Sequence, residues 1–183
     1  MKSKKMWIGL AILAVVVIAI FVYLNSRTRT LSPSDEETLT SGGITVSVSY
    51  SRPSVRGRLI FGPEDQEALQ PFGQYWRLGA NEATEISFNR DILFNGSPVK
   101  GGTYRMYAIP GATSFEMVLN TEVGKSGSVE PDPDHDVLRT KAQTQKTSSP
   151  VEQFTISLAP VDDGIQMVFE WSDTRFVVPL KVQ

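Results

Sequence analysis

Hydrophobic residues follow two different patterns in this chain, one near the amino terminus and one through most of the remaining residues. Met6 to Leu24 is an uncharged run of 19 residues in which only Gly9 falls outside the apolar set. As a helix it would measure roughly 28 Å, close to the roughly 30 Å hydrocarbon core of a bilayer. The run predicts a membrane-spanning helix, with Trp7 and Tyr23 near the two headgroup levels.

A cleavable signal peptide is the alternative interpretation of this run. Its apolar region should be only about 7–15 residues long and should precede a small-x-small cleavage site. Here the run is longer, and Asn25, Ser26 and Arg27 follow it. We therefore expect an uncleaved anchor. Three lysines precede the run and two arginines follow it, so the positive-inside rule favours a cytoplasmic tail at residues 1–5.

Residues 25–41 form a polar segment with one proline and two leucines. A segment this poor in apolar residues cannot bury much surface, so it is predicted to be a linker with little structure of its own. From residue 42 the hydrophobic period changes to two. Ile44, Val46 and Val48 alternate with polar residues, which is typical of a half-buried strand.

The same alternation recurs in short runs as far as Val182, separated by turn residues such as Asn95-Gly96 and Asp162-Asp163-Gly164. The only helical candidate in this part is Glu64 to Leu69, opened by Pro63. The pattern predicts an all-β fold for residues 42–183, an antiparallel β-sandwich or jelly-roll-like domain preceded by a single transmembrane helix.

Charge and cysteine content narrow the function classes. The chain carries 18 basic and 20 acidic residues. All charges before Thr30 are basic, so the rest has 13 basic and 20 acidic residues, a net charge of −7. This balance argues against a nucleic-acid partner. The absence of cysteine excludes disulfides, thiol nucleophiles and zinc–thiolate sites.

Three long ordered blocks carry a resemblance to a known family: Tyr50 to Gly62 (YSRPSVRGRLIFG), Pro71 to Thr84 (PFGQYWRLGANEAT) and Lys100 to Gly111 (KGGTYRMYAIPG), completed by Trp171 with Thr174-Arg175. From Gly43 to Val182 the chain resembles the bacterial domain-of-unknown-function 2911 family. The resemblance implies an exported β-rich protein without an established activity. This chain departs from the family in its added helix, in Phe115 where a tryptophan is expected, and in the loop Thr121 to Glu130, which lacks aromatic residues.

The densest polar constellation lies within the first two of these blocks. Arginine guanidinium groups bind carboxylate or phosphate through forked hydrogen bonds, and a tryptophan beside them could stack on a sugar. The candidate ligand-binding residues are Arg52, Arg56, Arg58, Trp76, Arg77, Asn81 and Glu82. The structural alternative is that Arg77 pairs with Glu82 and that the arginines hold loops between the two sheets.

No catalytic constellation and no cofactor motif emerges from the remaining residues. His135 is the only histidine, and no Gly-x-Ser-x-Gly elbow is present to supply a nucleophilic serine. Asp132 to Asp136 fits an EF-hand poorly, because Val137 stands where glycine is needed. A weak calcium site stays open, but a solvated acidic turn is the simpler interpretation, so no metal site is predicted.

These observations favour a non-enzymatic accessory or scaffolding subunit. We expect a single-pass protein of the bacterial cytoplasmic membrane, with its amino terminus inside and its domain in the periplasm. Its expected partners are the lipid bilayer, through Met6 to Leu24, and a larger integral-membrane protein complex. The alternatives are a small-molecule or glycan binding module that uses the Arg/Trp face and a hydrolase that uses Glu82 or His135.

Overall fold

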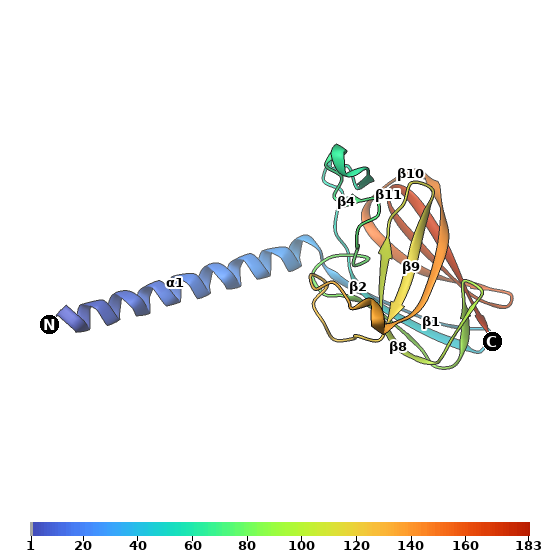
Figure 1. Cartoon of the computed structure of the whole chain (residues 1–183), viewed down its shortest axis with the longest axis horizontal. Helices are drawn as coiled ribbons and strands as arrows, with labels where there is room; N and C mark the ends of the chain where they lie inside the picture. Colours follow the sequence, from blue (N-terminus) through green and yellow to red (C-terminus); the bar gives the residue numbers. More distant parts are fainter. Residues whose placement is uncertain (1) are drawn as a thin grey trace.

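The computed structural model describes the backbone of residues 2–183 and, except at residues 2–5 and 25, their side chains. The predicted cytoplasmic tail, residues 1–5, lies outside the residues whose side chains are described. A single long helix, α1 (Lys2–Leu31), projects from one end of a β-domain (Figure 1). Its stretch Met6–Leu31 is long and apolar enough to cross a membrane, a test that a signal sequence also passes.

Eleven strands and two short 3₁₀ helices follow α1 within the described residues. The strands are β1 (Ser34–Ser41), β2 (Ile44–Ser51), β3 (Phe61–Gly62), β4 (Gln70–Pro71), β5 (Thr84–Phe88), β6 (Ile92–Phe94), β7 (Ser97–Val99), β8 (Gly102–Ile109), β9 (Ser114–Asn120), β10 (Asp136–Val161) and β11 (Gly164–Val182). The 3₁₀ helices are η1 (Glu64–Gln66) and η2 (Pro133–His135). The predicted helix at Glu64 to Leu69 is therefore a single short turn.

Nine of the eleven strands form two layers that share β10, and β3 and β4 form a separate short parallel pair. Residues 136–143 of β10 pair with β9, whereas residues 144–161 pair with β11. One layer runs in the order β1-β2-β5-β8-β9 and the other in the order β11-β6-β7, with β10 passing from one to the other. A bridge between Ser54 and Gln153 joins the segment after β2 to β10, so the layers also meet along a second edge. The prediction of an antiparallel all-β fold with one apolar helix is confirmed.

Alternation along the strands fills the space between the layers. In β2 the side chains of Ile44, Val46 and Val48 are fully buried, and the polar residues between them face outward. Tyr50 crosses the core, where its hydroxyl donates a 3.1 Å hydrogen bond to the carbonyl oxygen of Ile156 in β10. Burial of this apolar surface is the dominant stabilising contribution to the fold.

The predicted unstructured linker at residues 25–41 is wrong. Helix α1 continues to Leu31 and ends two residues before Pro33, since the residue preceding a proline is displaced from helical geometry. Ser34–Ser41 then pairs along its whole length with β2. This strand was missed because only Leu39 in it is apolar, so it shows no hydrophobic alternation. Its acidic and hydroxyl side chains suit an edge strand, which must resist pairing with other chains.

Two tight turns explain the local hairpins. Gly42 and Gly43, both with positive φ, connect β1 to β2 as a two-residue loop. Asn95 and Gly96 do the same between β6 and β7, with φ values of 50° and 84°. Both pairs adopt the left-handed conformation that matches the twist of the flanking strands. The Asn95-Gly96 turn was predicted from the sequence. The Gly42-Gly43 pair is also a typical hairpin turn, and it indicates a strand before β2 that was not predicted.

Candidate functional site

The side chain of Arg52 connects strands β1 and β10 through hydrogen bonds. Its guanidinium donates to a carboxylate oxygen of Asp35 at 3.1 Å, to the carbonyl oxygen of Phe154 at 3.2 Å and to the hydroxyl of Thr155 at 2.8 Å. These contacts connect β1 to the second half of β10 across the edge where the two layers meet. Arg52 is therefore held by structural partners.

Trp76 lies in the core and is 1% exposed. Its backbone pairs with that of Ala108 through hydrogen bonds of 2.8 and 2.9 Å, which turn the indole inward. There the ring stacks on Trp171, with centroids 5.8 Å apart, and contacts Phe61 and Phe154 edge-on. The prediction that Trp76 offers a stacking surface to a ligand is wrong, because core rings cover the indole.

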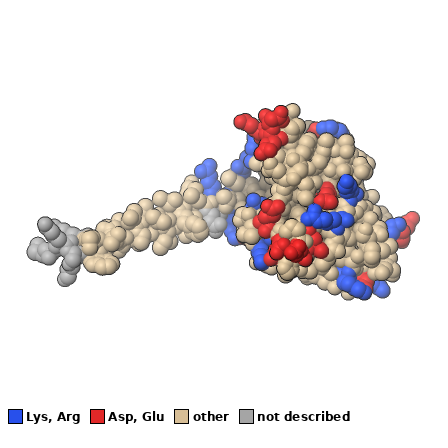
Figure 2. Space-filling model, in the orientation of Figure 1, with Lys and Arg blue, Asp and Glu red and all other residues tan. Residues whose placement is uncertain are grey.

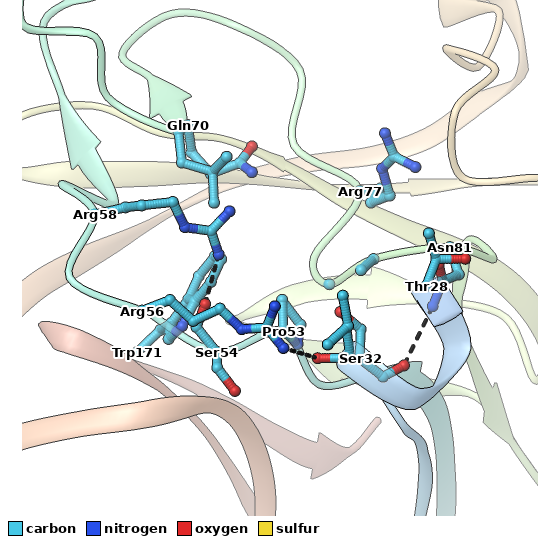
Figure 3. A pocket seen from close by; sticks show the side chains of 14 residues that line it. Thr28, Ser32, Pro53, Ser54, Arg56, Arg58, Gln70, Arg77, Asn81 and Trp171 are labelled. Carbon is cyan, nitrogen blue, oxygen red and sulfur yellow. Dashed lines mark hydrogen bonds between the residues drawn. The ribbon is translucent and has the colours of Figure 1, made fainter. Parts of the chain in front are cut away.

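Arg56, Arg58 and Arg77 do lie around one hollow, a cleft of about 350 Å³ beside the carboxyl end of α1. We call it the neck cleft; its lining includes Leu31, Arg56, Arg58, Arg77, Asn81 and Trp171. In Figure 3, Arg56 and Arg58 stand on one side, with Arg77 and Asn81 on the opposite side. No Asp or Glu lines the cleft, so three positive charges face it without a carboxylate among them.

The three arginines differ in the hydrogen bonds they already make. Arg58 donates to the carbonyl oxygens of Ser54 at 2.6 Å and Val55 at 3.0 Å. Arg56 donates from Nη2 to the carbonyl oxygen of Leu31 at 3.4 Å. Arg77 makes no side-chain hydrogen bond or ion pair within the described part of the chain. A guanidinium has five N–H donors, so each of the three keeps donors for a ligand.

The structural alternative, in which Arg77 pairs with Glu82, is not what the structure shows. Glu82 instead forms an ion pair with Arg29, near the end of α1, with 2.6 Å between Nη2 and Oε1. Both side chains are more than half exposed, so this pair contributes little to stability. Its effect is geometric, since it brings the last turn of the helix to the loop that precedes β5.

Further hydrogen bonds join the helix end to the domain. The side-chain amide of Asn81 donates to the carbonyl oxygen of Ser32 at 3.2 Å, and the backbone N–H of Arg52 donates to that of Pro33 at 2.8 Å. Together with the Arg56–Leu31 and Arg29–Glu82 contacts, they fix the direction in which α1 leaves the domain. Of the seven predicted site residues, Arg56, Arg58, Arg77 and Asn81 thus share the cleft, Glu82 lies beside it, and Arg52 and Trp76 belong to the fold.

Comparison with known proteins decides the family. A model of a protein family of unknown function, DUF2911, matches residues 32–180. The chain belongs to the DUF2911 family. Neither the search of curated proteins nor that of solved structures found a match. The family region begins at Ser32, directly after α1, so the DUF2911 domain includes the strand β1 that the hydrophobic pattern did not predict.

The DUF2911 domain also contains a polar cluster that sequence reasoning missed. Arg105, in β8, is completely buried beneath the segment 121–132. It donates to the hydroxyl of Tyr75 at 2.6 Å and to the carbonyl oxygen of Val129, and it lies 5.7 Å from the centre of the Tyr75 ring. Within the described residues its Nε and Nη1 have no hydrogen-bond partner. Arg105 alternates along β8 with the core residues Tyr104 and Met106, a pattern that gives no signal that its own side chain is buried.

The same outer face of the DUF2911 sheet holds Asp136, whose side chain is 7% exposed. Its carboxylate accepts hydrogen bonds from the Tyr107 hydroxyl at 3.0 and 3.1 Å and from the Asn120 amide at 2.8 Å, and it pairs with Arg139 at 2.7 Å. Burial, together with the Asp136 carboxylate, raises the pKa of Tyr107 above its usual value. We call Arg105, Tyr107, Asn120 and Asp136, together with Arg139 at their exposed border, the covered polar layer.

The acidic turn at Asp132 to Asp136 lies beside the covered polar layer and contributes one residue to it. Asp132 caps η2 by accepting the backbone N–H of Asp134 at 3.0 Å, and Asp136 belongs to the covered polar layer. The residues that the structure describes contain no group of three His, Cys, Asp or Glu side chains arranged to hold a metal ion. The turn therefore has a structural explanation in its own hydrogen bonds.

A second hollow, of about 490 Å³, opens on another face of the DUF2911 domain. Its lining includes Leu59, Phe61, Phe72 and Phe115. Lys146 and Asp173 lie on its border and pair with each other. Their mutual pairing leaves this hollow without the unpaired charges of the neck cleft.

Proposed function

We propose that this chain is a membrane-anchored, non-enzymatic accessory subunit that docks on a larger membrane protein complex through α1 and the DUF2911 domain. In this proposal α1 is retained as an anchor and is not removed as a signal sequence. The protein has its amino terminus on the cytoplasmic side of the inner membrane and its domain in the periplasm.

The helix carries this proposal. Its large apolar side chains from Met6 to Leu24 are between 47% and 70% exposed, and no other part of the described chain covers them. An apolar surface of this length is unfavourable in water and matches the thickness of a bilayer. The bonded junction at the neck then supports a domain held at the membrane in a defined orientation, which suits a subunit that presents one face to a neighbour.

The chemistry of the neck cleft favours binding over catalysis. Its charged groups are arginines, which stay protonated at physiological pH and therefore cannot exchange protons as general acids or bases. The one histidine lies on the exposed η2 turn, with its Nδ1 3.5 Å from the hydroxyl of Thr121. These features support an accessory role more than a hydrolase built on Glu82 or His135.

The alternative, a glycan-binding module, loses its main support. Sugar recognition by stacking needs an open aromatic face, and Trp76 is enclosed by other rings. The remaining cleft offers charge-assisted donors, which favour an anionic ligand over a neutral sugar.

Native purification tests the docking proposal. The intact chain should be extracted in a mild detergent beside a variant in which residues 6–24 are replaced by an equally long Leu/Ala helix. We expect the wild-type chain to migrate within an assembly larger than its monomer. The variant should stay in the membrane fraction but lose the assembly, because it keeps the anchor and loses the helix side chains. A wild-type chain recovered only as a free monomer would contradict the proposal.

A further inference from the structure

We propose that the neck cleft binds the phosphate group of an anionic phospholipid in the membrane that holds α1. The proposal rests on the anchoring role of α1 proposed above and adds a ligand class to it. Three independent features support it: the depth of the cleft along the helix, the donors in its walls and the charge of its surroundings.

The position of the cleft along α1 matches the lipid headgroups. The uncharged run ends at Leu24, and the cleft is lined by Thr28 and Leu31, four and seven residues further along the same helix. At about 1.5 Å per residue these positions lie roughly 6 and 10 Å beyond the end of the run. The headgroup layer on each side of the hydrocarbon core is roughly 5–8 Å thick. The Thr28 level of the cleft therefore lies within the headgroup layer, where the lipid phosphates are, and the Leu31 level lies roughly 2–5 Å beyond it.

The walls of the cleft supply donors suited to a phosphodiester. Arg56 uses only Nη2, and Arg58 uses Nε and Nη2, so both keep Nη1. Arg77 has no hydrogen-bond partner among the described residues. Trp171, which also lines the cleft, is 1% exposed, and its indole N–H has no acceptor within the described chain. Charge-assisted bonds from several arginines to phosphate oxygens are strong and geometrically specific.

The charge distribution favours a site at this place. The chain from Thr30 onward has a net charge of −7, so an anionic membrane repels the domain as a whole. Basic side chains nevertheless lie on the end of α1 and on the adjoining edge of the domain, with acidic side chains next to them on the same face (Figure 2). Arg27 and Arg29 on α1 are two of these basic residues, and the ion pair of Arg29 with Glu82 neutralises the charge of that carboxylate. The neck is therefore the part of the domain that an anionic lipid surface attracts.

Lipid titration of the intact chain in detergent tests the proposal. Native mass spectrometry would count bound phosphatidylglycerol against phosphatidylcholine. Each arginine near an anionic surface contributes about fivefold to binding. Because Arg56 and Arg58 already make hydrogen bonds, we expect wild-type protein to prefer phosphatidylglycerol by about tenfold. The triple variant Arg56→Gln, Arg58→Gln, Arg77→Gln should bind the two lipids about equally.

A matched control removes the same charge from the opposite end of the domain. The variant Arg90→Gln, Lys100→Gln, Lys181→Gln should keep the wild-type preference. Should the triple cleft variant melt early, Arg77→Gln alone replaces it. Arg77 has no side-chain hydrogen bonds to lose within the described residues, so about a fivefold loss of preference is expected. Equal binding of both lipids by wild type, or an unchanged preference in the cleft variants, overturns the proposal.

Inorganic phosphate distinguishes the source of the anion. Binding of free phosphate to a wild-type chain without lipid preference would assign the cleft to a soluble anion and contradict the lipid proposal. The anchoring role is tested separately by whether the chain needs detergent to stay in solution. A chain that needs detergent but shows no lipid preference refutes only the lipid site, whereas a chain soluble without detergent refutes the anchor.

Discussion

The neck cleft and the covered polar layer both gather arginines on a domain with net negative charge, but they use them differently. In the covered polar layer, Arg139 pairs with Asp136 and Glu116, and Arg105 is sealed beneath the segment 121–132. In the neck cleft, the guanidinium groups of Arg56, Arg58 and Arg77 make no contact with a carboxylate within the described residues and face a hollow of about 350 Å³, although the backbone N–H of Arg56 donates to Glu152. The comparison teaches that the partners of an arginine, more than its place in a motif, separate structural arginines from those available to a ligand.

The largest expected effect lies in the covered polar layer. Asp136→Ala leaves the buried Tyr107 hydroxyl without its acceptor. It also removes one of the two acceptors of the Asn120 amide and one of the two carboxylate partners of Arg139. We expect the free energy of unfolding to fall by about 2–4 kcal/mol, measured by urea denaturation. The control Asp163→Ala removes an exposed pair with Lys181 and should not shift the midpoint measurably. Equal midpoints for both variants would remove the distinction between the two regions.

Arg52 should behave like a member of the polar layer although it belongs to the same motif as Arg56 and Arg58. Arg52→Ala removes bonds to Asp35, Phe154 and Thr155 that connect β1 to β10. The expected loss is about 1–2 kcal/mol in the same denaturation experiment. Lipid preference should stay unchanged, and a variant that loses preference without losing stability would place Arg52 in the ligand site.

Alkaline pH should probe Tyr107. Burial and the Asp136 carboxylate raise its pKa in the folded state, so the unfolded chain releases the phenol proton first, near pH 10. Stability is therefore complete below that pH and declines above it, by up to about 1.4 kcal/mol per pH unit. Urea denaturation at pH 9 and pH 11 should show a smaller decline in Tyr107→Phe than in wild type. Tyr50 and Tyr104, whose pKa values are also raised, account for a remaining decline. An identical decline in both proteins would show that Tyr107 is not held in this way.

Arg77 should give the smallest effect on stability. Because it makes no side-chain hydrogen bond within the described residues, Arg77→Ala should change the free energy of unfolding by less than about 0.5 kcal/mol. The same variant should weaken the preference for phosphatidylglycerol. A loss of more than about 1 kcal/mol would move Arg77 into the structural group and favour a loop-holding role.

Elements that depend on neighbouring residues were predicted correctly from the sequence, whereas elements that depend on pairing with a distant strand were not. The Asn95-Gly96 turn and the alternation of β2 depend on neighbouring residues, so the sequence alone identified them. Strand β1 has almost no apolar residues and is stabilised by its partner β2, which no local pattern reports.

The candidate site shows the same limit. Three arginines and Asn81 were correctly grouped by their density in the motif. The inward rotation of Trp76, however, follows from its pairing with Ala108, 32 positions later in the chain. The contribution of α1 to the site could not be predicted from the sequence, because Leu31 and Ser32 contact residues that follow β2 in the chain.

Retention of α1 is the claim on which the anchored subunit and the lipid site both depend. Intact-mass spectrometry of the chain purified from the membrane fraction of its producing cells tests it most directly. The account predicts a single species that retains Met6 to Leu24, near the 20.2 kDa of residues 1–183. A shorter species that begins after Leu24 would show that the helix is removed as a signal sequence, and would contradict it.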